Sequence, residues 1–222
     1  MGEVEIEYLN VLGLKDGATL SEIQEKYLEK TFQPKFRDYF VEDESLKEEF
    51  LRYYRAYARL LNSGSWADDP HKNPSFYPPG KAYKFLFNQG LYFFINGEYI
   101  KAGEKFQAAF DLHGDDLAVS IYLGVLLLKR KSYYAAEKYF SKAVAKDPQN
   151  EDAFYFLGVS FQKAGNAEKA IEAFNRVKQL NPSRTEVAYR LKEIRSNRKQ
   201  PTGPEKKQTE SFWRRLFRKT GH

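Results

Sequence analysis

The stretch EDAFYFLGVSFQKAGNAEKAIEAFNRVKQLNP, residues 151–182, decides the fold. Apolar residues recur every three or four positions on both sides of Gly165-Asn166, and this spacing predicts amphipathic helices at about 151–164 and 167–180. Gly165-Asn166 interrupts the pattern, and Asn181-Pro182 ends the second helix. The stretch therefore predicts a hairpin of two short helices.

The same hairpin occurs three times in the chain, at a spacing of 34 residues and without a gap. Small residues at matched positions let two antiparallel helices approach closely, and a phenylalanine fills the space beside them. The matched positions are Gly90, Gly124 and Gly158; Ala102, Ala136 and Ala170; and Phe106, Phe140 and Phe174. The chain therefore carries an internal repeat.

This repeat resembles the tetratricopeptide repeat, which has a period of 34 residues and a pattern of Leu-Gly, Ala-x3-Phe and Pro. The third copy fills the pattern with Leu157, Gly158, Phe161, Ala170, Phe174 and Pro182. The first copy departs from it, because Gln89 replaces the leucine and Gly114 the proline. The resemblance implies an all-α solenoid over residues 83–198, with repeats at 83–116, 117–150 and 151–184.

A capping helix is expected after the third repeat, because the last hairpin would otherwise expose its apolar face. Val187, Leu191 and Ile194 have the helical spacing that this contact needs. We expect Arg184 and Arg190 to stay in solvent.

In the family the first helix of each repeat lines a concave groove, and the resemblance implies a peptide-binding groove here. Its candidate residues are Lys84, Phe87, Leu91, Phe94, Ile121, Val125, Lys129, Tyr155, Val159 and Lys163. Relatives that clamp the carboxylate of chaperone C-termini carry basic residues and asparagine at positions where this chain has Phe87, Leu91, Asp152 and Phe156. We therefore expect an apolar or aromatic peptide ligand rather than an acidic C-terminus.

Residues 1–62 contain a second helical pattern. Thr19 with Glu22, and Ser45 with Glu48, are capping-box pairs that predict two helix starts. The helix after Ser45 carries an apolar stripe of Leu46, Phe50, Tyr53, Tyr54, Tyr57, Leu60 and Leu61. A plain helical hairpin would account for this pattern.

The N-terminal pattern also resembles a J-domain, the helical module of heat-shock co-chaperones. The matching residues include Tyr8, Leu12, Gly13, Tyr27, Phe50, Ala56, Tyr57 and Leu60. The family's functional loop reads His-Pro-Asp, whereas this chain has Gln33, Pro34 and Lys35. A lysine at the aspartate position replaces an attraction for the chaperone by repulsion. We expect a degenerate J-like domain that keeps the fold without stimulating the chaperone's ATPase.

Two further segments complete the expected organisation. Residues 63–82 are rich in proline, glycine and small polar residues and read as a linker, pinned by Trp66, Phe76 and Tyr77. Residues 199–222 form a polar, basic tail that ends in a short amphipathic segment. Its candidate contact residues are Phe212, Trp213, Arg214, Arg215, Leu216, Phe217, Arg218 and Lys219. Such a segment can contact an anionic membrane, a groove or RNA.

Charge and composition narrow the function. The net charge of +6 belongs to the tail, because residues 184–222 carry 12 Lys and Arg against 4 Asp and Glu. The chain has no cysteine and none of the common catalytic or phosphate-binding motifs. We read Asp68, Asp69 and His71 of the linker as turn residues rather than metal ligands. We therefore expect no catalytic residue, metal or cofactor.

The leading hypothesis is a non-enzymatic scaffold or adaptor that binds a protein segment in the repeat groove. The alternatives are a co-chaperone that recruits clients to the seventy-kilodalton heat-shock chaperone, and RNA or membrane-surface binding through the tail. No specific nucleic-acid partner is predicted. The acidic start lacks an apolar run, so we expect a cytoplasmic location, with the tail at the cytoplasmic face of a membrane.

Overall fold

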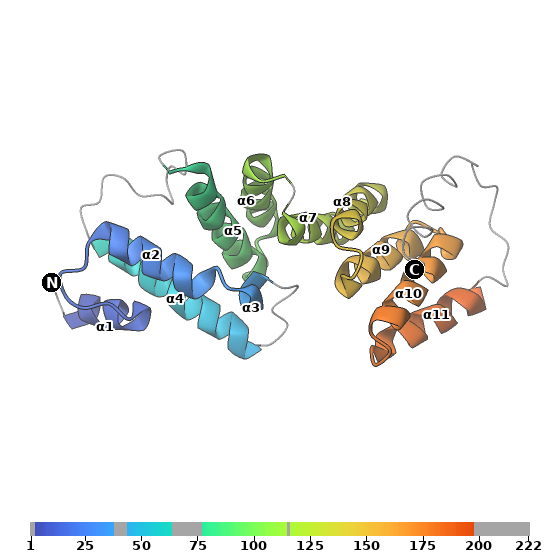
Figure 1. The fold of residues 1–222 in the computed structure, drawn as a ribbon, viewed down its shortest axis with the longest axis horizontal. Coiled ribbons are helices and arrows are strands. Elements are labelled where there is room, and N and C mark those ends of the chain that lie inside the picture. Colours follow the sequence, from blue (N-terminus) through green and yellow to red (C-terminus); the bar gives the residue numbers. More distant parts are fainter. Residues whose placement is uncertain (1–2, 38–43, 64–76, 115, 198–222) are drawn as a thin grey trace. The chain divides into compact units, whose positions relative to one another are not determined.

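The computed structural model describes residues 3–37, 44–63, 77–114 and 116–197, and within these ranges every regular element is a helix (Figure 1). The helices divide between two compact units, residues 1–126 and 127–222, with α7 crossing the boundary. Their bounds are α1 Glu3–Leu12, α2 Leu20–Thr31, α3 Pro34–Arg37, α4 Glu44–Ser63, α5 Pro79–Ile95, α6 Tyr99–Leu112, α7 Leu117–Lys129, α8 Tyr133–Lys146, α9 Glu151–Lys163, α10 Ala167–Leu180 and α11 Thr185–Asn197. The predicted all-α fold class is confirmed.

The first four helices form the N-terminal part of the first unit, where α2 and α4 lie side by side and α1 packs against both (Figure 1). The capping box predicted for α2 is present: Thr19 N donates to Glu22 Oε2 at 2.7 Å, and Glu22 N donates to Thr19 Oγ1 at 3.3 Å. Helix α4 begins at Glu44, so Ser45 already lies in its first turn and the second predicted cap is wrong. These helices bury the apolar stripe of α4 against α1 and α2.

The core of the N-terminal helices extends into α5. Its buried members are Leu9, Leu12, Ile23, Tyr27, Leu28, Ala56, Tyr57, Leu60, Leu61 and, from α5, Phe85. The rings of Tyr27 and Tyr57 stack at 4.1 Å between centroids, and Phe85 lies 6.0 Å from Tyr27. The fully buried Asn88 donates to Thr31 Oγ1 at 2.6 Å. The four N-terminal helices and α5 therefore share one interior.

The segment before α5 is only partly described. Helix α4 ends at Ser63 and α5 begins at Pro79, so the helix already covers residues 79–82 of the predicted linker. Gln24 Nε2 donates to the hydroxyl of Tyr77 at 2.7 Å, and the Tyr77 ring lies 5.5 Å from Phe85. Pinning is thus confirmed for Tyr77, whereas Trp66, Phe76, Asp68, Asp69 and His71 lie outside the described residues.

Glycines at the predicted helix crossings have the expected packing role. A Cβ atom added to Gly90 would lie 2.7 Å from the Phe106 ring, and one added to Gly158 would lie 2.8 Å from the Phe174 ring. Both phenylalanines are fully buried. Each crossing therefore needs a residue without a side chain, as the repeat pattern implied.

The turn inside each hairpin uses a left-handed backbone conformation. Gly97 and Gly165 have φ values of 77° and 84°. The matched residue of the second hairpin is Lys131, which adopts a φ of 59° although it has a side chain. Only glycine takes this conformation without steric cost, so the second turn is strained relative to the other two.

Helix α11 packs on α10 and covers the end of the second unit. Val187, Leu191 and Ile194 are buried, as predicted for a capping helix. The expectation that Arg184 and Arg190 stay in solvent is wrong, because both turn back onto α9. Arg184 lies over the Tyr155 ring at 4.2 Å, and Arg190 Nε donates to the Tyr155 hydroxyl at 2.9 Å.

Candidate functional site

In the first repeat, the predicted groove is filled by the protein's own side chains. Phe87 and Leu91 of α5 are almost completely buried, with exposed fractions of 0% and 1%. The Phe32 ring, at the end of α2, lies 5.7 Å from the Phe87 ring, and the Arg37 guanidinium lies 4.5 Å from Phe32 and 5.8 Å from Phe87. Residues of α2 and α3 thus occupy the place that a ligand would take beside Phe87.

An ion pair holds this covering in position. Arg37 Nη2 donates to Asp116 Oδ2 at 2.6 Å, and the two side chains are 29% and 16% exposed. Asp116 also caps α7, because its Oδ1 accepts from Val119 N at 3.1 Å. Burial and, after it, the Asp116 charge raise the pKa of neighbouring Tyr83 far above its usual range, so this hydroxyl stays neutral. The sequence analysis did not identify Arg37, Asp116 or Phe32.

The remaining predicted groove residues of the first unit are mostly covered as well. Ile121 and Val125 of α7 are buried. Phe94 is half-buried and lies 5.2 Å from the Tyr122 ring. Lys84 is also half-buried, with its ammonium 5.3 Å from the Phe32 ring.

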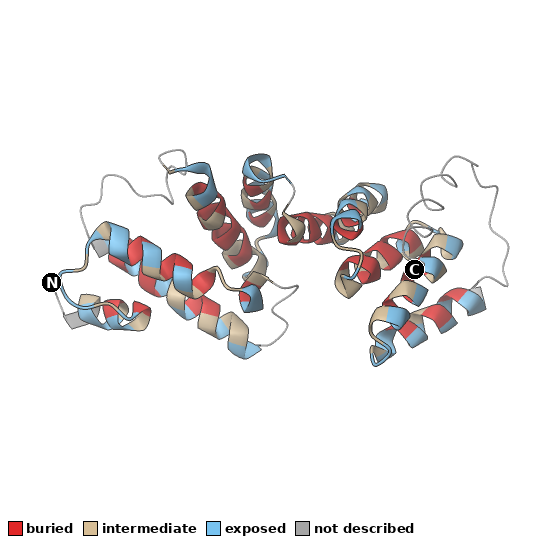
Figure 2. Cartoon of the chain, in the orientation of Figure 1, coloured by how far each residue is buried: buried red, intermediate tan, exposed pale blue. Residues whose placement is uncertain are grey.

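In the second unit, the predicted groove residues differ in exposure. Tyr155 is buried beneath Arg184 and Arg190 of the capping segment. Val159 is half-buried, and the two lysines, Lys129 and Lys163, are exposed. Arg184 is held in place by Asp152, whose Oδ1 accepts from Nη1 at 2.5 Å. The aromatic member of this set is therefore already covered by the chain's own arginines (Figure 2).

One pocket, here named the α2–α5 pocket, retains part of the predicted groove. It has a volume of about 540 Å³ and is lined by Glu25, Leu28, Glu29, Phe32, Gly80, Lys81 and Lys84. Glu29 pairs with Lys26 at 2.6 Å. Lys81 and Lys84 lie over the rings of Tyr77 and Phe32 and form no ion pair with a carboxylate of the described residues. The pocket thus joins an apolar wall to two available cations.

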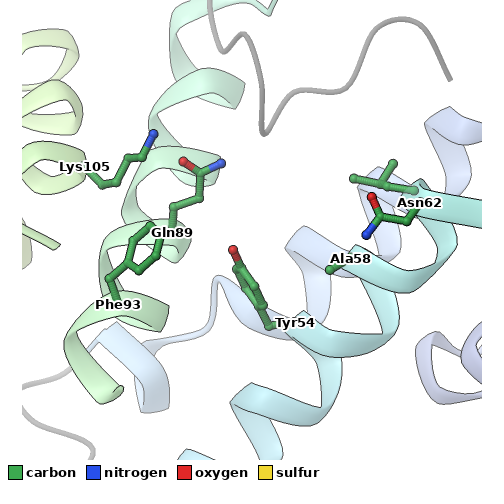
Figure 3. Close-up of a pocket in the computed structure, with 7 residues that line it drawn as sticks. Tyr54, Ala58, Asn62, Gln89, Phe93 and Lys105 are labelled. Carbon is green, nitrogen blue, oxygen red and sulfur yellow. The ribbon is translucent and has the colours of Figure 1, made fainter. Parts of the chain in front are cut away.

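A second pocket, here named the α4–α6 pocket, lies where α4 faces α5 and α6 (Figure 3). It has a volume of about 270 Å³ and is lined by Tyr54, Ala58, Leu61, Asn62, Gln89, Phe93 and Lys105. The Tyr54 ring stacks on Tyr92 of α5 at 4.0 Å, which fixes its position. Figure 3 shows the Tyr54 hydroxyl and the Asn62 amide facing the space between the helices, with Lys105 extending beside the Gln89 amide.

The J-like loop lies at the junction of α2 and α3. Gln33 Nε2 donates to the carbonyl oxygen of Glu29 at 2.9 Å, and Pro34 is the first residue of α3. Lys35 Nζ donates to both carboxylate oxygens of Glu49 at 2.8 Å. All three residues therefore serve local structure, and the lysine charge is directed towards α4.

Two sequence predictions concern chemistry rather than the groove. Within the described ranges, no group of three or more His, Cys, Asp and Glu side chains could hold a metal ion. In the same ranges, no helix is long and apolar enough to cross a bilayer. The eight tail residues proposed as contacts, from Phe212 to Lys219, lie outside the described residues.

Comparisons with known proteins identify the helical repeats. Residues 87–151 and 127–193 match two family models, each described as a tetratricopeptide repeat. A 73-residue segment, 33% of this chain, is 29% identical to human RANBP2-like and GRIP domain-containing protein 8, of which it spans only 4%. The hairpins from α5 to α10 are therefore tetratricopeptide repeats, as the sequence predicted.

Solved structures agree with this fold at low sequence identity. The protein MamA, residues 41 to the end, from Desulfovibrio magneticus RS-1 is 22% identical, with a TM-score of 0.57 over 82% of this chain and 88% of that one. The first tetratricopeptide domain of Spaghetti (RPAP3), bound to the HSP90 peptide SRMEEVD, is 20% identical, with a TM-score of 0.51 over 53% of this chain and 94% of that one. The J-domain resemblance stays a prediction.

Proposed function

We propose that this protein is a non-enzymatic interaction scaffold that binds an apolar segment of another protein in the α2–α5 pocket. The observation that carries the proposal is the position of Lys84. It is a predicted groove residue, and it still lines an open pocket, together with the apolar Leu28 and Phe32. The peptide-bound state of the structurally similar Spaghetti domain supports a role in peptide binding.

The proposal differs from an ordinary repeat groove in one respect. Because Phe32 and Arg37 cover Phe87, the N-terminal helices form one wall of the binding site instead of leaving the groove to the ligand. Leu28 and Phe32 supply apolar contact, and the Lys81 and Lys84 ammonium groups hydrogen-bond to ligand carbonyl or carboxylate oxygens. The N-terminal helices therefore act as part of the scaffold.

Site-specific photo-crosslinking tests this function. A benzophenone amino acid replaces Gly80 at the pocket rim, where an added side chain meets no atom within 4 Å, and a second variant carries it at the exposed Lys138 of α8. The proposal requires a protein that cross-links at position 80 and not at position 138, and that is lost when Lys81 and Lys84 are both changed to Glu. A partner that cross-links equally well in the double variant would show that this pocket is not the site.

The J-like loop does not favour a co-chaperone function, since Lys35 is engaged by Glu49 instead of offering a negative charge. For the tail we keep a separate proposal, weak and salt-sensitive contact with anionic membranes through residues 211–219. Four basic residues contribute roughly 4 kcal/mol near such a surface. Ordering about nine residues costs on the order of 1 kcal/mol each. Co-sedimentation with acidic vesicles at low salt, with residues 199–222 deleted as the control, tests it.

A further inference from the structure

The α4–α6 pocket combines polar donors with an apolar wall in a way that core packing does not explain. Its position in the repeat pattern shows this. Gln89 occupies the place of Leu123 and Leu157 in the other two repeats, and those leucines are 6% and 0% exposed. Gln89 is also buried, at 2% exposed. Since burying an amide costs more than burying a leucine side chain, the polar residue at this one repeat needs a reason other than packing.

The charge of the pocket is one-sided. Lys105 is the only residue of the lining that is charged at neutral pH. It is half-buried and makes no ion pair or hydrogen bond with any described residue. Asn62 adds an amide without a hydrogen bond in the described chain, and the Tyr54 hydroxyl faces the same space (Figure 3). The ammonium, the two amides and the hydroxyl can all donate to one anionic group.

The size of the pocket limits what that group can be. Its volume of about 270 Å³ is below the range of about 300–1,000 Å³ that is usual for small-molecule sites. A single side chain of a partner protein fits this volume better than a free metabolite. Ala58, Leu61 and Phe93 provide apolar contact for the methylene stem of that side chain or for an apolar neighbour.

We propose that the α4–α6 pocket binds the carboxylate of an acidic side chain, flanked by apolar residues, in a peptide segment of a partner protein. Lys105 pairs with the carboxylate, and Gln89 and Asn62 donate to its remaining lone pairs. The apolar neighbours pack on Phe93 and Leu61. This site is separate from the α2–α5 pocket, and it gives the scaffold a second contact of opposite chemical preference to a purely apolar groove.

Nuclear magnetic resonance titration of the full-length protein tests the proposal with defined probes. The probe is a capped seven-residue peptide with Leu-Glu-Phe at its centre, and the matched peptide has Leu-Gln-Phe. We expect amide shifts at Gln89 and Lys105 with the glutamate peptide and about tenfold weaker binding of the glutamine peptide, since a hydrogen bond to a charged group is lost. Sodium acetate at the same concentration should leave these amides unshifted.

Variants locate the binding on named residues. Lys105→Met keeps the apolar stem and should lower the affinity for the glutamate peptide about tenfold, to that of the glutamine peptide. Lys101→Met, on the same helix but outside the pocket, should not change it. Gln89→Leu restores the residue of the other repeats and should weaken binding while the thermal midpoint holds or rises. Equal binding of the two peptides, unchanged affinity in Lys105→Met, or the same shifts from acetate alone would overturn the proposal.

Discussion

Arg37 of α3 and Asp116 at the start of α7 lie 79 residues apart in the sequence, and their side chains meet at 2.6 Å between Nη2 and Oδ2. This pair fastens the N-terminal helices over Phe87, a residue that the repeat pattern alone assigns to an open groove. The contact therefore decides which part of the first repeat a ligand can reach. It is also the most direct test of the arrangement.

Removing the Arg37 charge should destabilise the first unit. In Arg37→Met the half-buried Asp116 loses its partner, and the expected loss of unfolding free energy is about 2 kcal/mol. Arg55→Met is the matched control, because its pair with Glu48 is long, at 3.6 Å, and exposed, so its effect should stay within about 0.5 kcal/mol. Urea unfolding measures both. Equal effects of the two changes would mean that the Arg37 contact has no special role.

A methyl group at the helix crossing of the third repeat should be poorly tolerated. In Gly158→Ala the new Cβ meets the buried Phe174 ring at 2.8 Å, and overpacking of this kind costs about 1–3 kcal/mol. Gly80→Ala is the control, since nothing lies within 4 Å of its added Cβ. Thermal denaturation followed by circular dichroism should show a lower midpoint for the first variant and none for the second.

The strained turn of the second repeat offers a stabilising change. Lys131→Gly should raise the unfolding free energy by about 0.5–1 kcal/mol, because glycine adopts a positive φ without the clash of a Cβ. Gly165→Lys at the matched turn should have the opposite sign. If both changes destabilise the protein, the turn conformation is not what distinguishes these positions.

The N-cap of α2 should make stability depend on pH. Hydrogen bonds from the Thr19 backbone and then its side chain lower the pKa of Glu22 below 4.5. A carboxyl whose folded pKa is depressed stabilises the protein above its unfolded pKa, and this contribution disappears as the pH falls through the folded pKa. Glu22→Gln should therefore lower the thermal midpoint near neutral pH, with a difference that shrinks below pH 4.5. The parallel variant Glu25→Gln should show no such pH-dependent difference.

The J-like loop should not act on a chaperone in its native form. We expect no stimulation of the ATPase of the seventy-kilodalton heat-shock chaperone by the wild-type protein, and stimulation appearing, if anywhere, only after Gln33→His with Lys35→Asp. The second change also places a carboxylate beside Glu49, so its thermal midpoint should be checked. Stimulation by the wild-type protein would show that the electrostatic argument from Lys35 is wrong.

The features that could be read from the sequence are local ones. The spacing of Gly90 and Gly158 with their phenylalanines repeats along the chain, and the Thr19 cap involves residues three apart, so both patterns appear within a short window. The burial of Phe87 could not be read in this way. It depends on Arg37, whose side chain finds its partner only after two helical modules have packed together.

The same limit applies at the C-terminal end and at the candidate pockets. Arg184 and Arg190 have the spacing of a solvated helix face, and only the position of Tyr155 turns them inward. A weak signal did exist for the α4–α6 pocket, since Gln89 breaks the repeat pattern. That signal says that the position is unusual, but not that α4 brings Tyr54 and Asn62 to face it.

The shared interior of α1–α4 and α5 has a consequence for synthesis on the ribosome. Domains generally fold as units while the chain emerges from its N-terminus. Here the first four helices leave the ribosome before Phe85, whose ring completes the stack with Tyr27 and Tyr57. Until α5 emerges, Tyr27 and Tyr57 lack one wall, and Thr31 lacks its contact with Asn88. The nascent chain should therefore gain resistance to proteolysis in one step, when the first repeat becomes available, rather than after the first 63 residues.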